Sequence, residues 1–300
     1  MKQNYRANGK LMLTGEYFVL DGAKTLALPT QKGQTLSISE LSEAVLEWKS
    51  YDIQQNVWFE ATFSPDFDII QSSDISVAQT LQKMLITCRE LNPQFTPFHK
   101  KIETHLEFPQ DWGLGSSSTL LYNLAQWAEV DAYQLLWKSF KGSGYDIACA
   151  GSEKPLIYQL VKGLPEVKTS NFNPSFKNQL FFLHLNQKQN SREGILQYQL
   201  IQKDKKEAIA TLNTITETIE TTQHLDEFIA LLTQHEQLIA DYLEISTIKQ
   251  QLFNDYQGLI KSLGAWGGDF VLVTKQENML SYFAEKGYTT LIPYEEMIKG

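Results

Sequence analysis

The first third of the chain alternates short apolar runs with polar turn residues, a pattern typical of β-strands. Residues 52–56, four of which are polar, separate the last two runs. A β-rich beginning is therefore expected. The predicted strands are Lys10–Leu13, Tyr17–Leu20, Thr35–Ser39, Ala44–Tyr51 and Val57–Phe63.

Residues 75–130 change to helical spacing with one strand between two helices. In Ile75–Leu91 the apolar positions fall near one face of a helix. Residues 102–108 then alternate apolar and polar side chains, which suits a strand with one solvated face. A glycine-rich loop follows Pro109, and helical spacing returns at Thr119–Val130. The order is strand, glycine loop, helix.

The second half mixes strands with longer helices. Glycine, proline and asparagine cluster at 163–178, after a predicted strand at Leu156–Val161, so we expect a linker there. We expect an α+β sandwich in two domains, residues 1–165 and 175–300. The remaining predicted elements are strands at Leu180–Leu185, Phe270–Thr274 and Thr289–Ile292, and helices at 192–221, 225–243, 248–262 and 276–286.

Composition narrows the class of protein. Of 300 residues, 42% are hydrophobic, which is enough to build a packed core. The net charge is 26 − 35 = −9, and this acidity argues against nucleic acid as a partner. There is no run of about 18 apolar residues, so no membrane span is expected. With only Cys88 and Cys149 we expect no disulfide framework and a cytoplasmic location.

The stretch Asp111–Thr119 (DWGLGSSST) is the most informative for chemistry. Gly113 and Gly115 allow positive φ and close backbone approach, and three serines open a helix whose free N–H groups attract an anion. No Lys-Ser or Lys-Thr pair follows, and Ser118 stands where a dinucleotide fingerprint has its third glycine. The alternative is that Ser116–Ser118 only cap a helix after a tight turn.

Three further segments carry candidate groups. Asp146 follows the turn Gly142-Ser143-Gly144 and could act as a base, although such an Asp is more often solvated or capping. Lys10 in the run Gly9–Tyr17 could support a transferring phosphoryl group, or be an ordinary strand residue. Residues 261–269 (KSLGAWGGD) could form a second backbone wall for a phosphate, or a simple turn.

These four segments, in this order, resemble the GHMP family of small-molecule kinases. The first family motif corresponds to Asn8–Tyr17, with Asn8 in place of a proline, and its G-L-G-S-S motif is intact at Gly113–Ser117. Within the family the motifs are most similar to those of phosphomevalonate kinases, and the resemblance covers nearly the whole chain. It implies a two-domain fold, with a ribosomal protein S5 domain 2-like N-terminal domain and a ferredoxin-like C-terminal domain.

The resemblance also implies ATP and Mg²⁺ as cofactors and a role for each matching position. Asp146 and Lys10 would be catalytic, and Ser117 would also contact the metal. No acidic residue lies in 135–141 to supplement it. The ATP-binding positions would be Gly113, Leu114, Gly115, Ser116, Ser117, Ser118, Gly264, Ala265, Gly267 and Gly268. The acceptor-binding positions would be Ser143, Gly144, Ser191, Arg192, Lys261, Ser262 and Asp269.

The implied activity is ATP-dependent phosphorylation of a small anionic acceptor, as in phosphomevalonate kinases, by a monomer or homodimer without membrane or nucleic-acid partners. Two alternatives stay open. One is a GHMP kinase for mevalonate or another small alcohol or sugar. The other is a non-catalytic relative that binds a nucleotide or metabolite, suggested by Trp266 at a position where the family has glycine.

Overall fold

The computed structural model describes residues 3–187, 191–264, 266 and 268–300. The chain forms two compact units that are discontinuous in sequence. The first comprises Met1–Gly9, Lys32–Gln110 and Leu114–Gly151, and the second Lys10–Gln31, Asp111–Gly113 and Ser152–Gly300. These ranges differ from the expected 1–165 and 175–300, because the long strands β1 (Gln3–Met12) and β2 (Thr25–Glu40) each contribute to both units.

The first unit is built on a mostly antiparallel sheet. Its strands are hydrogen-bonded in the order β5-β4-β3-β6-β2, and β1 also pairs with β2. Strands β3 and β6 pair in parallel, with Trp48 opposite Ile102. The other strands of this unit are β3 (Leu46–Tyr51), β4 (Val57–Phe63), β5 (Ile69–Ser72) and β6 (Lys100–Leu106).

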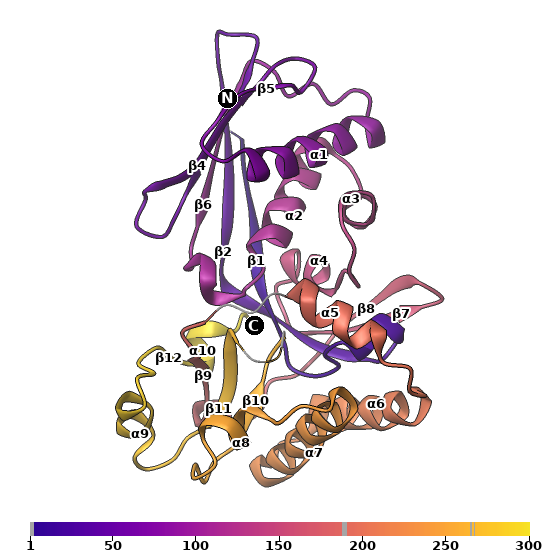
Figure 1. Cartoon of the computed structure of the whole chain (residues 1–300), viewed down its shortest axis with the longest axis vertical. Helices are drawn as coiled ribbons and strands as arrows, with labels where there is room; N and C mark the ends of the chain where they lie inside the picture. The colour runs from indigo at the N-terminus through magenta and orange to yellow at the C-terminus, as the bar shows by residue number, and fades with distance from the viewer. Residues whose placement is uncertain (1–2, 188–190, 265, 267) are drawn as a thin grey trace. The chain divides into compact units, whose positions relative to one another are not determined.

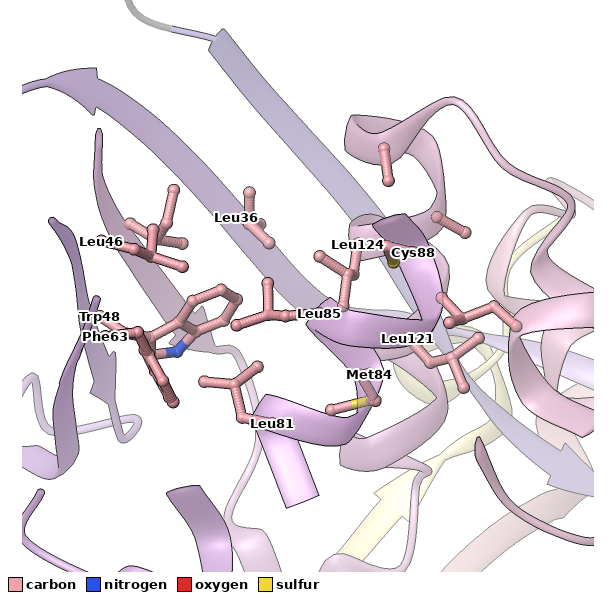
Figure 2. Packing of buried hydrophobic residues seen from close by; sticks show 14 of the residues in the cluster. Leu36, Leu46, Trp48, Phe63, Leu81, Met84, Leu85, Cys88, Leu121 and Leu124 are labelled. Atoms are coloured by element: carbon pink, nitrogen blue, oxygen red, sulfur yellow. The ribbon is translucent and has the colours of Figure 1, made fainter. Parts of the chain in front are cut away.

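Helices supply the other half of the first unit's core. Leu81, Leu85 and Cys88 on one face of α1 are buried, as its helical spacing predicts. Figure 2 shows these side chains meeting Trp48 from the sheet and Leu124 from α2. Burying each large apolar side chain contributes about 1.5–3 kcal/mol. The helices are α1 (Ile75–Leu91), α2 (Ser116–Ala128), α3 (Ala132–Ser139) and α4 (Tyr145–Ala150).

The second unit contains a separate four-stranded antiparallel sheet in the order β10-β11-β9-β12. Helices α6 and α7 lie side by side in this unit (Figure 1). The sheet strands are β9 (Leu180–His184), β10 (Ile260–Ser262), β11 (Phe270–Thr274) and β12 (Leu291–Pro293). The helices are α5 (Ser191–Leu200), α6 (Lys206–Thr221), α7 (Leu225–Leu243), α8 (Ile248–Leu252), α9 (Met279–Glu285) and α10 (Tyr294–Met297). The expected α+β class is confirmed.

The strand predicted at 17–20 is wrong. Residues Phe18–Asp21 form a 3-10 helix, η1, with bonds from Leu20 N to Tyr17 O at 3.0 Å and from Gly22 N to Val19 O at 3.2 Å. Positive φ values at Gly15 (85°) and Tyr17 (61°) turn the chain away from the extended conformation. The apolar run is buried without being a strand.

The predicted linker at 163–178 contains a strand instead. β8 (Leu164–Thr169) pairs with β7 (Leu156–Val161) in an antiparallel hairpin. Its two turn residues, Lys162 and Gly163, have φ of 52° and 79°, the combination that two-residue hairpins favour. The glycine therefore marks a turn inside a domain. A short 3-10 helix, η3 (Lys177–Gln179), follows before β9.

The helix predicted at 248–262 is also shorter than expected. α8 ends at Leu252, and residues 260–262 form β10, which pairs with β11. Tyr256 OH donates a 2.6 Å hydrogen bond to Thr274 O, which fixes the intervening segment against the sheet. The helical pattern at 192–221 is likewise divided between α5 and α6.

Two expectations from composition can be compared with the fold. Among the described residues, no helix combines the length and apolar character needed to cross a bilayer. Cys88 and Cys149 are both buried and free.

Candidate functional site

The start of α2 in the first unit has the geometry of an anion-binding helix terminus. Gly115 precedes the helix with φ 88°, and no side chain caps the helix there. The first N–H groups of a helix have no partner inside it, and the helix dipole places partial positive charge on them. Ser117 is exposed and Ser118 is buried, its hydroxyl donating to Gly115 O at 2.9 Å. The serines therefore do not cap the helix with their side chains.

A buried contact to β2 holds this helix start in place. Thr119 Oγ1 donates to Gln34 Oε1 at 2.8 Å, and Asn123 Nδ2 donates to Gln34 O at 2.9 Å. Thr119 and Asn123 lie one turn apart on α2 and are at most 1% exposed. Because hydrogen bonds are directional, these two buried bonds fix the orientation of α2 as well as its distance from β2. Sequence analysis did not single out Gln34, Thr119 or Asn123.

Asp146 lies in the first turn of α4, and Gly144, which precedes the helix, has φ 89°. Its Oδ1 accepts the N–H of Ile147 at 3.1 Å, and the side chain is half-buried. α4 packs against α2. Burial, then the neighbouring Cys149 and Asp146, raise the pKa of Tyr133. The predicted acceptor residues Ser143 and Gly144 precede this helix and are buried.

Lys10 belongs to the second unit, where it contacts the glycine loop. Its Nζ donates to Gly113 O at 2.7 Å. Gly113 has φ 63°, and a Cβ placed on it would lie 2.2 Å from the carboxylate of Asp269. Only glycine combines that conformation with that approach. The structure thus brings together three predicted site residues, Lys10, Gly113 and Asp269, within this unit.

Residues 111–113 pack on the second unit's sheet. The ring of Trp112 meets that of Phe270 edge to face at 5.3 Å, and His184 Nε2 lies 3.3 Å from Asp111 O. Asp269 N donates to Gln187 O at 2.8 Å, which holds the residue that faces Gly113. The first glycine of the G-L-G-S-S motif is therefore positioned by β9 and β11.

The predicted second glycine loop begins at Gly264, with φ 68° and open space around it. Trp266 is 5% exposed, and its backbone N–H donates to Tyr17 OH at 3.3 Å. The indole is therefore packed inside the second unit, in a cluster with Tyr17 and Tyr198. Gly268 is buried. Ala265 and Gly267, also predicted to bind ATP, lie outside the described residues.

Lys261 and Ser262, predicted to hold an acceptor, belong to a buried ionic cluster. Lys261 is 0% exposed, and its Nζ donates to Glu16 Oε1 at 2.5 Å and to Ser262 O at 2.6 Å. Glu236 Oε1 accepts from Ser262 N at 3.1 Å and from Ser262 Oγ at 2.7 Å. Lys261 Nζ also lies 3.6 Å from Glu236 Oε2. In the described structure the lysine faces carboxylates rather than solvent.

His235 completes this cluster. Its Nε2 accepts the N–H of Gly15 at 2.9 Å, so that nitrogen carries no proton and the neutral ring is protonated on Nδ1. Burial, and then Lys261, hold the pKa of His235 well below its usual value. Burial outweighs the attraction of Lys261 and raises the pKa of Glu16 to about 7. Burial likewise raises the pKa of Glu236.

Ser191 and Arg192 begin α5, but their side chains lie outside the described residues. Further along α5, Tyr198 OH donates to Asp21 Oδ2 at 2.6 Å, and its ring stacks on Tyr17 at 5.6 Å. A Cβ at Gly194 would lie 2.5 Å from Tyr17 OH. α5 is therefore held close to the turn that follows β1.

The residues present fit a phosphate better than a protein-held metal. An uncapped helix start after a glycine with positive φ suits a nucleotide's phosphates. For Mg²⁺, no three His, Cys, Asp or Glu side chains converge in the part of the chain that the structure describes. The exposed hydroxyl of Ser117 remains the candidate metal contact. A cavity of about 670 Å³ between α6 and the β7–β8 hairpin contains none of the predicted site residues.

Comparison with known proteins shows similarity in structure. No protein-family model matches the chain, and no curated protein sequence matches it. The mevalonate kinase of Methanococcus jannaschii is 16% identical with a TM-score of 0.71, and the alignment covers 97% of both chains. The phosphomevalonate kinase of Streptococcus pneumoniae, in complex with phosphomevalonate and AMPPNP, is 15% identical with a TM-score of 0.69, covering 96% of this chain and 99% of that one. Lactococcus lactis galactokinase, complexed with galactose, is 13% identical with a TM-score of 0.67, covering 99% and 93%.

These similarities establish the fold. The chain has the two-domain α+β fold of GHMP kinases, as the motif resemblance implies.

Sequence reasoning missed His235 and Glu236. The available signal was their place on a helix in which Leu232, Ile239 and Ala240 are buried, because two ionisable residues on such a face need buried partners.

Proposed function

We propose that the protein transfers a phosphoryl group from ATP to a small anionic acceptor, with phosphomevalonate as the first candidate. The observation that carries the proposal is the start of α2, where Gly115 turns the chain with φ 88° into an uncapped helix opened by three serines. Such a terminus binds anions through its backbone N–H groups. The fold shared with mevalonate, phosphomevalonate and galactose kinases supports the same activity.

When bound, ATP with Mg²⁺ supplies the transferable phosphoryl group and charge neutralisation. The residues of this chain would bind the nucleotide and the acceptor and orient them for transfer. Leu114 to Ser118 would hold the phosphates, Ser117 would contact the metal, and Gly264 and Gly268 would border the nucleotide. In phosphoryl transfer, positioning and electrostatics supply most of the catalysis, so few chemically active groups are required.

Asp146 is the proposed base. Its carboxylate would accept the proton of the acceptor hydroxyl as the oxygen attacks phosphorus. Lys10 would stabilise negative charge that develops during the transfer. Lys10 Nζ bonds to Gly113 O, which places its positive charge beside the first glycine of the G-L-G-S-S motif. Ser143, Gly144, Ser191, Arg192 and Asp269 are the proposed acceptor contacts.

Replacement of Asp146 by Asn tests this proposal. We expect at least a 10²-fold loss of ATP-dependent transfer to phosphomevalonate, because the amide cannot accept the proton. ATP affinity measured by calorimetry should stay within a fewfold of wild type. Asp66→Asn removes an exposed carboxylate of the same unit and is the matched control. Undiminished turnover by Asp146→Asn would contradict the assignment.

An acceptor panel separates the kinase alternatives. Phosphomevalonate, mevalonate and galactose differ in charge and size, so the preferred acceptor should be identifiable from relative kcat/KM values. ATP binding without transfer to any acceptor would instead support a nucleotide-binding protein without catalytic activity.

A further inference from the structure

Two adjacent residues of α7 hold the backbones of two different motif segments. His235 Nε2 accepts the N–H of Gly15, five residues after Lys10 in the first motif. Glu236 accepts both the N–H and the hydroxyl of Ser262, two residues before Gly264. Segments more than 240 positions apart in sequence are thus attached to one turn of one helix.

Lys261 links the two attachments. Its ammonium group donates to Glu16, the residue after Gly15, and to the carbonyl of Ser262. It also faces the second oxygen of Glu236 at 3.6 Å. Two of its N–H donors thus have hydrogen-bond acceptors, the third faces a carboxylate oxygen beyond hydrogen-bond distance, and all of these groups are buried. Among the described residues, the lysine is enclosed by these protein groups and is 0% exposed.

We propose that His235, Glu236 and Lys261 form a positioning clamp that fixes the turn after Lys10 relative to the loop that begins at Gly264. Lys261 and Ser262 then influence catalysis through this clamp, in place of the acceptor contact predicted from sequence. In its kinetic consequences the inference rests on the proposed function. A buried ionic cluster contributes little net stability compared with apolar residues of similar size. We therefore assign this cluster the role of holding the two segments in one defined arrangement.

The first test replaces His235 by Leu, which removes the acceptor of the Gly15 N–H, and by Gln, which can present Oε1 in place of Nε2. Misplacement of reacting groups by about 1 Å costs about 10²-fold in rate. We expect His235→Leu to lower kcat about 10²-fold with the acceptor KM changed less than threefold, and His235→Gln to recover most of the loss. His224→Leu, at the exposed start of the same helix, is the matched control.

The second test distinguishes the clamp from direct acceptor binding by Lys261. Glu236→Gln keeps an oxygen for Ser262 but removes one carboxylate that faces the lysine. The clamp predicts the same fall in kcat for anionic and neutral acceptors. A lysine that held the acceptor's charge would instead change KM for anionic acceptors alone, and that result would overturn the proposal.

A readout independent of activity separates failure of the clamp from failure of the proposed function. Amide hydrogen exchange of peptides containing Gly15 should rise at least tenfold in His235→Leu relative to His235→Gln, while peptides of the first unit stay unchanged. If the wild-type protein phosphorylates no acceptor, the proposed function fails and this measurement still tests the clamp. Unchanged exchange at Gly15 in a folded His235→Leu variant would refute it.

Discussion

Replacing Glu16 by Gln should change how stability depends on pH. Glu16 is fully buried, with Lys261 2.5 Å from Oε1 and His235 Nε2 3.4 Å from Oε2. In the described part of the chain Oε2 has no hydrogen-bond partner. Burial raises the pKa of this carboxyl from 4.5 to about 7 in spite of Lys261. Folded Glu16 therefore keeps its proton over a range in which the unfolded chain has lost it.

The sign and size follow from proton linkage. Between pH 4.5 and about 7 the folded state binds more protons at Glu16, so the free energy of unfolding falls as pH rises. A shift of 7 − 4.5 = 2.5 units corresponds to about 3 kcal/mol at about 1.4 kcal/mol per unit. That contribution is fully present below pH 4.5 and is lost as pH rises through about 7. Glutamine cannot lose a proton, so Glu16→Gln should lack it.

The difference between the two proteins removes most of the contribution of neighbouring titratable residues. The lowered pKa of His235 gives the opposite slope below pH 6.5, and the raised pKa of Glu236 gives the same slope as Glu16, but both residues are present in each protein. Because part of the contribution is already lost at pH 5, urea unfolding at pH 5 and pH 8 should show Glu16→Gln gaining about 2.5 kcal/mol relative to wild type over that interval. Glu277→Gln, at an exposed position, should show no such change. A difference that is flat with pH would mean that Lys261 keeps Glu16 ionised throughout, and would refute the reasoning.

Two further predictions concern close packing. Gly113→Ala should destabilise the protein about 1–3 kcal/mol more than Gly287→Ala in urea unfolding, because both glycines have positive φ but only at Gly113 would the added Cβ lie 2.2 Å from a carboxylate, that of Asp269. Equal losses would show that Asp269 moves aside without cost. Cys88 should react with a thiol reagent at pH 8 only after unfolding, because burial raises the pKa of its thiol to about 12. Rapid labelling of the native protein would contradict the buried placement.

The local sequence pattern predicted those elements in which the apolar positions are the positions that the structure buries. The limits of α1, β4, β7 and β11 agree with the sequence analysis, since α1 has a helical repeat of apolar positions and the three strands are short apolar-rich runs. The errors occurred where the burial of a residue does not reveal its backbone conformation. Phe18 and Val19 are buried in a 3-10 turn, and the run before Gly163 continues into a hairpin strand. Positive φ at Tyr17 and Lys162 cannot be inferred from hydrophobicity.

In the candidate site, too, local features could be predicted from the sequence and nonlocal contacts could not. Glycines and serines around Gly115 predict the α2 terminus because that chemistry is local and belongs to the backbone. The environment of Lys261 is nonlocal, since its partner Glu16 is 245 positions away. A lysine is normally placed at the surface, where it can meet an anionic ligand. Its burial becomes favourable only when two carboxylates and a carbonyl converge on it, so its role as an internal link depends on the folded arrangement.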